Sequence, residues 1–133
     1  MMKDNLMLYI GQAIDVSRKA YAPYSNYQVG SVLIADTGEV FTGCNVENAA
    51  YPAGICAERG ALAQAVSNGV QNFLGVIVAS KSGGSPCGIC RQMLYEFSPT
   101  MRVICVTFEG DIIIDSTLDK LLPHGFGPSS LSD

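Results

Sequence analysis

Three cysteines in two short motifs are the residues of this sequence best suited to chemistry. Cys87 and Cys90 are spaced C-x-x-C after a proline, and Cys56 stands earlier in the chain. At the start of a helix, the first turn brings both sulfurs of such a pair to the same end, where they can bind one metal ion. Cys56 fits as a third ligand because it also opens a predicted helix that follows a strand. With three protein ligands on zinc, the fourth position stays open for water.

The charges around such a centre determine what it can do. Three thiolates on Zn²⁺ leave a net charge of −1, which weakens the metal as a Lewis acid. Two helix N-termini directed at the sulfurs would offset part of that charge, and Arg59 could add a positive charge or hydrogen bonds to the sulfurs. The metal would then lower the pKa of its water towards neutrality. Glu58 lies close to Cys56 in sequence, so its carboxylate could take that proton and pass it to a leaving group.

Each of these residues also has a simpler interpretation. A lone C-x-x-C pair can be a redox pair or two buried cysteines, although a redox pair is expected after the first strand of a thioredoxin-like unit and this one lies in the second half of the chain. A structural zinc site usually has four ligands, and the only histidine is His124. Glu58 alone would be read as a solvated helix residue. Cys44 and Cys105 lie in strand-like runs, so we expect them in the core.

Alternating helical and strand-like segments would position these motifs. An amphipathic helix is predicted over 5–20, and a β-hairpin over 28–35 and 39–47 around Asp36-Thr37-Gly38. The remaining predicted elements are a helix over 56–68 that stops at Gly69, a buried strand over 73–80, a helix from Ser85-Pro86 to Pro99, strands over 102–108 and 111–115, and a short helix over 117–121 capped by Ser116. This order predicts an α/β domain in which helices cover one central sheet.

The bulk composition limits the possible partners. The 133 residues fit one domain, spanning 1–133, and 48% of them are hydrophobic while 15% are charged. The net charge is −4 and the 8 Lys and Arg are scattered, so no basic patch for nucleic acid is visible and free small molecules are the expected partners. A mean hydropathy of +0.25 is apolar for a small protein and favours an oligomer.

The sequence also indicates the cellular compartment in which we expect the protein. The N-terminal stretch has no continuous apolar region of the kind found in signal peptides, and no segment has the length of apolar residues needed to span a bilayer. Five cysteines are an odd number, which favours reduced thiols over a disulfide framework. We therefore expect a cytoplasmic protein with no membrane partner.

Together the motifs resemble a known family. C-A-E followed by P-C-x-x-C is the established signature of zinc nucleoside and nucleobase deaminases. Within that superfamily the chain is most similar to the small cytidine deaminases, and the resemblance covers nearly its whole length. The matching stretches are AYAPYSNYQVG, TGCNVENAAYPAGICAER, SPCGICRQ and LLPHGFGP. The resemblance implies a three-layer α/β/α sandwich with a central mixed five-stranded sheet.

The resemblance also implies the chemistry. The family's zinc ligands fall on Cys56, Cys87 and Cys90, with one Zn²⁺ per chain, and its proton shuttle falls on Glu58. Arg59 would lie in the second shell of the metal. The implied reaction is attack of zinc-bound hydroxide on C4 of cytosine, after Glu58 has protonated N3, with release of ammonia. Free cytidine and deoxycytidine would become uridine and deoxyuridine, a step of pyrimidine salvage.

The family's substrate contacts can be placed in the same way. Asn45 and Glu47 match a pair that hydrogen-bonds the sugar 3′-hydroxyl, and positions two apart on a strand face the same side. By pattern alone the two would be a polar solvent face. Tyr27 occupies the place of an aromatic, usually Phe, that stacks near the base. The remaining matches, Ala49, Tyr51 and Phe126, are residues that reach or cover the site of a neighbouring subunit in a homotetramer with shared active sites.

Two alternatives remain at this point. The first is a deaminase of the same scaffold that acts on blasticidin, nucleotides or nucleic acid. The sugar-binding pair argues against blasticidin, and a phosphate-bearing substrate should bring more Arg or Lys than the Arg59 and Arg91 found in the matching segments. The second is a non-catalytic zinc-binding module, which loss of Glu58 would have supported. His124 stands where the family more often has a small residue, and we expect it in a surface loop.

Overall fold

One mixed sheet organises the molecule, which is described from a computed structural model over residues 2–131. Its strand order is β2-β1-β3-β4-β5, in which β3 and β4 are parallel and the other neighbours are antiparallel. The strands are β1 (Val29–Ala35), β2 (Val40–Cys44), β3 (Phe73–Ser80), β4 (Arg102–Val106) and β5 (Ile112–Thr117). The helices are α1 (Leu6–Ser17), α2 (Ala57–Ser67), α3 (Gly88–Tyr95) and α4 (Leu118–Leu121), with short 3₁₀ turns at Lys3–Asn5, Tyr51–Ala53 and Pro128–Ser130.

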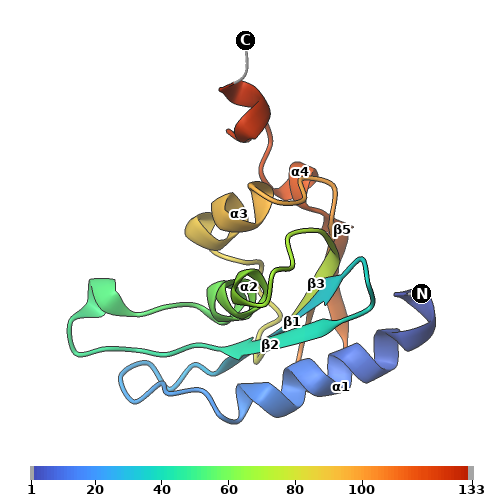
Figure 1. The fold of residues 1–133 in the computed structure, drawn as a ribbon. Coiled ribbons are helices and arrows are strands. Elements are labelled where there is room, and N and C mark those ends of the chain that lie inside the picture. Colours follow the sequence, from blue (N-terminus) through green and yellow to red (C-terminus); the bar gives the residue numbers. More distant parts are fainter. Residues whose placement is uncertain (1, 132–133) are drawn as a thin grey trace.

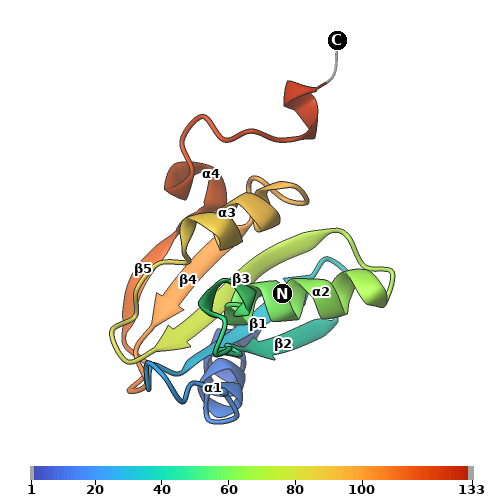
Figure 2. The ribbon, with the colours of Figure 1, turned by 90° about the vertical axis from the view of Figure 1, so that its left-hand side faces the viewer.

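Helices cover both faces of this sheet. Figure 1 shows α1 on one face and α2 and α3 on the other, and Figure 2 shows the same layers from the side. Two separate cores correspond to the two faces. One joins the apolar side of α1 to alternate residues of the central strands, and the other joins α2, α3 and α4 to the opposite side chains of the same strands. The expected three-layer α/β/α sandwich with a five-stranded sheet is therefore confirmed.

Several predicted boundaries agree with the structure. The buried strand over 73–80 is β3, and its continuous apolar run is explained by helices on both faces. The helix predicted over 56–68 is α2, after which Gly69 has a φ of +80°. Such a left-handed residue ends a helix most readily when it is glycine.

Other boundaries were predicted wrongly, among them the end of the first helix, which was expected at residue 20 and lies at Ser17. The strand expected over 39–47 stops at Cys44, because the chain then leaves the sheet. The helix expected from Ser85-Pro86 begins at Gly88, with Cys87 as its extended N-cap residue. The cap of α4 is Thr117 rather than Ser116, since β5 continues to Thr117.

Gly43 determines how closely α2 lies on the sheet. A Cβ at this position would stand 2.3 Å from the carbonyl oxygen of Ala57 and 2.6 Å from the backbone nitrogen of Ala61. Only glycine permits this approach of backbone to backbone. Because Ala57 is the first residue of α2, the same contact positions the start of that helix.

None of the helices within residues 2–131 is long and apolar enough to cross a membrane.

Candidate metal centre and substrate cavity

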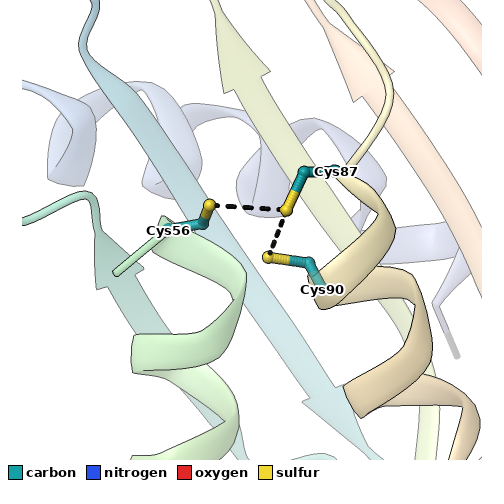
Figure 3. A group of neighbouring side chains, drawn as sticks. All are labelled: Cys56, Cys87 and Cys90. Carbon is teal, nitrogen blue, oxygen red and sulfur yellow. Dashed lines mark hydrogen bonds between the residues drawn. The ribbon is translucent and has the colours of Figure 1, made fainter. Parts of the chain in front are cut away.

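Three cysteine sulfurs converge between the starts of α2 and α3. Cys56 is the N-cap residue of α2, Cys87 is the N-cap residue of α3, and Cys90 lies in the first turn of α3. The Sγ atoms of Cys56 and Cys87 are 3.6 Å apart, and those of Cys87 and Cys90 are 3.5 Å apart. Figure 3 shows the three side chains directed at one another from the two helices.

This arrangement fits zinc. Zn–S bonds of about 2.3 Å at tetrahedral angles place neighbouring sulfurs about 3.8 Å apart. The observed separations are close to that value, and all three sulfurs lie within 4.8 Å of one another. Cys56, Cys87 and Cys90 are therefore positioned to bind a metal ion, and three protein ligands leave one tetrahedral position for water.

The other two cysteines do not join this group. Cys105 is fully buried in β4, and burial raises the pKa of its thiol to about 12, so it stays protonated. Cys44 is half-buried at the end of β2, although it was expected in the core.

Positive charge is placed beside the sulfurs. The N-terminal ends of α2 and α3 carry the partial positive charge of their unpaired N–H groups. A guanidinium nitrogen of Arg59, Nη2, lies 3.7 Å from Cys56 Sγ. Hydrogen bonds from Cys90 and Arg59 lower the pKa of Cys56 to about 5. These hydrogen bonds favour the thiolate form of Cys56, which is the form that binds a metal ion.

Glu58 brings a carboxyl group to the same place. It is the second residue of α2, its side chain is 3% exposed, and its Oε1 has no hydrogen-bond partner within residues 2–131. Burial raises its pKa to about 7. A buried carboxyl group of this pKa can both accept and donate a proton near neutral pH, which is the property that a general acid–base group needs.

A cavity of about 430 Å³ opens beside these groups, within the size range of small-molecule sites. Cys56, Glu58 and Cys87 form part of its wall. Predicted substrate-binding residues that also line it are Tyr27, Asn45, Glu47 and Tyr51. The structure thus brings these residues of the loops before β1 and after β2 into one cavity with the cysteines.

Asn45 and Glu47 lie beyond the end of β2, although the sequence analysis expected them within that strand. They flank Val46, whose isolated β-bridges to Tyr21 and Ile55 keep this segment extended outside the sheet. The Asn45 amide accepts a hydrogen bond from the Val29 backbone N–H (2.9 Å) and donates one to the Tyr27 carbonyl oxygen (2.8 Å). Glu47 Oε1 accepts the backbone N–H groups of Tyr24 (3.0 Å) and Ser25 (3.1 Å).

Both polar side chains therefore hold the loop that precedes β1. Glu47 Oε2 also accepts the Ser25 hydroxyl, and this hydrogen bond lowers the pKa of the Glu47 carboxyl below its ordinary value. Glu47 is thus an anion at neutral pH, with its geometry set by the loop and with lone pairs still available to a ligand.

Tyr27 uses the hydroxyl that a phenylalanine would lack. Its side chain is 39% exposed, and its hydroxyl donates to Ser80 Oγ at 3.1 Å. A second hydrogen bond joins it to the Ser82 hydroxyl. Ser80 is 2% exposed and lines the cavity, although no motif in the sequence marked it as a site residue. The available signal was a hydroxyl at the end of an otherwise apolar run.

Two predicted residues do not lie in this cavity. Ala49 and Phe126 are exposed and absent from its wall, and the Phe126 side chain is 56% exposed. Phe126 belongs to the segment after α4, which runs along α3 and away from the sheet (Figures 1 and 2). His124 lies in the same segment, exposed and with a φ of +57°, as expected of a loop residue.

The outer side of α3 holds that segment. Gln92 Nε2 donates to the carbonyl oxygen of Phe126 at 2.8 Å. Arg91 donates from Nε to the Pro86 carbonyl oxygen at 2.8 Å and from Nη1 to the Leu121 carbonyl oxygen at 2.7 Å. Arg91 therefore connects the loop that carries Cys87 with the end of α4.

Comparison with known families agrees with this geometry. Residues 3–107 match the family described as "Cytidine and deoxycytidylate deaminase zinc-binding region". The chain therefore belongs to the cytidine and deoxycytidylate deaminase family, a class of zinc-dependent hydrolytic deaminases.

Individual relatives show which members of this family the chain is similar to. The chain is 42% identical to the cytidine deaminase of Sporosarcina psychrophila over 126 residues, which cover 92% of each chain. It is 40% identical to a probable cytidine deaminase of Dictyostelium discoideum, with 98% of this chain and 90% of that one covered. The crystal structure of cytidine deaminase from Burkholderia pseudomallei superposes with a TM-score of 0.85 at 41% identity, covering 90% of this chain and 98% of the other.

Proposed function

We propose that this protein catalyses the hydrolytic deamination of free cytidine and deoxycytidine to uridine and deoxyuridine, with release of ammonia. The observation that carries the proposal is the Glu58 carboxyl group, which is buried without a hydrogen-bond partner for Oε1, raised in pKa, and next to three converging cysteines in one cavity. A structural zinc site has no use for such a carboxyl group, because leaving it unpaired costs stability. Relatives named cytidine deaminase support the choice of substrate.

The chain's own residues supply most of the chemistry. Zinc held by Cys56, Cys87 and Cys90 would lower the pKa of a water molecule towards neutrality. Glu58 takes a proton from the attacking water and gives it to N3 of the cytosine. It then takes the remaining proton of the added hydroxyl and gives it to the 4-amino group, which departs as ammonia. The N-terminal ends of α2 and α3, together with Arg59, balance the negative charge of the thiolates.

The cavity wall favours a nucleoside without phosphate. Arg59 is the one Lys or Arg among the described residues that line it, and its guanidinium is already directed at Cys56. A nucleotide or a polynucleotide would need further cations to neutralise its phosphates. Asn45 and Glu47 are the proposed contacts of the sugar 3′-hydroxyl, and the ring of Tyr27 is the proposed contact of the base. The acidic chain, with a net charge of −4, points away from a nucleic-acid partner.

The proposed assembly is a homotetramer in which neighbouring subunits complete each site. Its support is the exposure of large apolar side chains: Tyr51 is 76% exposed, Phe126 56% and Ile89 60%. Such exposure is expected of side chains that a partner covers. Ala49, Tyr51 and Phe126 are the residues proposed to reach a neighbouring site, and Tyr51 also lines the cavity of its own chain. We place the protein in the cytoplasm, where thiolate ligands stay reduced.

The decisive experiment is to follow ultraviolet absorbance when zinc-loaded protein is mixed with cytidine, deoxycytidine, cytosine or CMP. We expect rapid loss of the cytidine band with the two nucleosides and none with cytosine or CMP. No change with any of the four, in protein that holds one zinc per chain, would overturn the proposal and favour a polynucleotide or antibiotic substrate.

The variant Glu58→Ala tests the role of the carboxyl group. It should retain zinc and assembly but lose turnover by a factor on the order of 10² to 10⁴, since only the proton carrier is removed. Zinc content by elemental analysis and mass by light scattering are the controls. Turnover near that of the wild type would show that Glu58 does not carry the proton.

A further inference from the structure

Three hydroxyl groups meet at the end of β3, beside the cavity. Tyr27 donates to Ser80 Oγ at 3.1 Å, and the Gly83 backbone N–H donates to the same oxygen at 3.0 Å. The hydroxyls of Ser82 and Tyr27 are also hydrogen-bonded to each other. The register of the sheet explains this meeting, because Val29, two residues after Tyr27, pairs with Ser80 across the antiparallel strands β1 and β3.

This arrangement determines what Ser80 can still do. A serine hydroxyl has two acceptor positions and one hydrogen to donate. Tyr27 and Gly83 occupy both acceptor positions, so Ser80 retains only its donor capacity. No group within residues 2–131 accepts that hydrogen.

The Ser80 hydroxyl hydrogen, which has no acceptor in the described part of the chain, lies at the wall of the cavity. Ser80 is 2% exposed and its side chain lines the cavity that also contains Cys56 and Glu58. A buried donor without a partner destabilises the folded protein unless a ligand or water accepts its hydrogen. A bound ligand with an oxygen acceptor would meet that need.

We propose that Ser80 donates a hydrogen bond to an oxygen atom of the bound nucleoside, and that Tyr27 is the positioning residue that turns Ser80 into a donor. The identity of the ligand as a nucleoside rests on the function proposed above. A phenylalanine at position 27 would leave one acceptor position of Ser80 empty, so the serine hydrogen could turn away from the cavity. The tyrosine hydroxyl therefore acts on substrate affinity through Ser80.

Kinetics of four zinc-loaded variants test this proposal. Ser80→Ala should raise the KM for cytidine by roughly threefold to tenfold, the effect of one neutral hydrogen bond, while kcat changes less than about twofold. Tyr27→Phe should raise KM in the same sense, and adding it to Ser80→Ala should cause no further change, since both act through one hydrogen bond. Tyr21→Phe is the matched control and should leave KM unchanged, because the Tyr21 side chain is 57% exposed and lies outside the cavity wall.

Substrate analogues identify the accepting oxygen. Deoxycytidine lacks the 2′-hydroxyl, 3′-deoxycytidine lacks the 3′-hydroxyl, 5′-deoxycytidine lacks the 5′-hydroxyl, and 2-thiocytidine has sulfur in place of the 2-carbonyl oxygen. Ser80→Ala should lose its effect with one of these analogues only. An effect of equal size with every analogue would overturn a direct hydrogen bond.

Binding and unfolding measurements distinguish failure of the Ser80 proposal from failure of the proposed deaminase function. Calorimetric titration with uridine compares the wild type with Ser80→Ala without turnover, and Ser80→Ala should bind several-fold more weakly. A lower unfolding temperature for Tyr27→Phe with unchanged nucleoside affinity would show that the network only stabilises the fold, and would overturn the proposal. Wild-type protein that binds uridine but deaminates no nucleoside would refute the proposed function alone, whereas a wild type without nucleoside affinity would refute both.

Discussion

Replacing Gly43 with alanine should push α2 away from the sheet and disturb the metal centre at its start. The new Cβ would lie 2.3 Å from the Ala57 carbonyl oxygen and 2.6 Å from the Ala61 backbone nitrogen. These distances are about 1 Å shorter than ordinary contacts of about 3.5 Å. Both obstacles are backbone atoms of a helix, so no side-chain rotation can relieve the overlap, and the helix or the strand must move.

The size of the effect follows from this displacement. Overpacking of a well-packed interface costs about 1–3 kcal/mol, and we expect the upper end, about 3 kcal/mol, because two backbone groups are contacted. A shift of about 1 Å at the first turn of α2 would also carry Cys56 and Glu58 away from Cys87 and Cys90. Misplacement of this size can lower turnover on the order of 10²-fold.

Gly60 is a matched control on the other side of the same interface. A Cβ there would meet its nearest atom, the Cys44 carbonyl oxygen, at 3.9 Å, which is ordinary contact. Gly60→Ala should therefore stabilise the helix by about 0.5–1 kcal/mol. Urea unfolding of zinc-loaded protein gives the two free energies, and zinc per chain and turnover of cytidine give the effect on the site. Gly43→Ala protein with wild-type stability, zinc and turnover would refute the argument that this contact positions the centre.

Three further outcomes are expected from the structure. Cys87→Ala should lose most bound zinc and unfold at a lower temperature, because metal binding is coupled to folding. Elemental analysis measures the zinc, and thermal unfolding with and without a chelator measures the stability. Full zinc retention would count against the three-cysteine centre. Arg91→Lys should lower the free energy of unfolding by about 1.5–3 kcal/mol, since one ammonium cannot bond both carbonyl oxygens that the guanidinium reaches. Urea unfolding measures this change, and an unchanged midpoint would contradict the prediction. Gly125→Ala should weaken the packing of residues 122–131, because its Cβ would lie 2.8 Å from the Tyr95 ring. The expected result is faster amide hydrogen exchange confined to that segment. Unchanged exchange would show that the ring moves aside.

The sequence predicted those parts of the molecule that local patterns determine. The strand over 73–80 is bounded as expected, because eight successive residues are nearly all apolar and must be buried on both sides. The convergence of Cys56 with the C-x-x-C pair was predicted from ligand chemistry and helix starts, and the distances agree with it. Each of these inferences needed only neighbouring residues and the geometry of one element.

Contacts between distant residues determine what the sequence did not predict. The start of α3 is displaced to Gly88 because Pro86 is buried and its carbonyl oxygen is held by Arg91. Asn45 was read as a strand residue, but it lies beyond β2, where its side-chain amide adds bonds to the backbone of Val29 and Tyr27, which lie far away in sequence. No periodic pattern reports such side-chain to backbone bonds.

Ser80 illustrates the same limit at the cavity. A serine at the end of an apolar strand gives no sign that both its acceptor positions are filled by residues from two loops. The sequence likewise shows an aromatic residue at position 126 but not its exposure on a segment held by Gln92. Both features depend on which elements lie side by side.

The spacing of the three sulfurs also makes the metal a cross-link of the chain. Cys87 and Cys90 are 3 residues apart, whereas Cys56 is separated from Cys87 by 31. Zinc bound to all three therefore closes a loop that contains α2 and the central strand β3. By the loop-closure relation for a disulfide of this length, the constraint removes about 3–4 kcal/mol of conformational entropy from the unfolded chain. The near pair can hold zinc in an unfolded chain, but Cys56 can join it only when β3 has brought the two helix starts together. Loss of the metal would therefore lower the stability of the whole fold by restoring that freedom to the unfolded chain, while β3 keeps its pairing with β1 and β4 in the folded state.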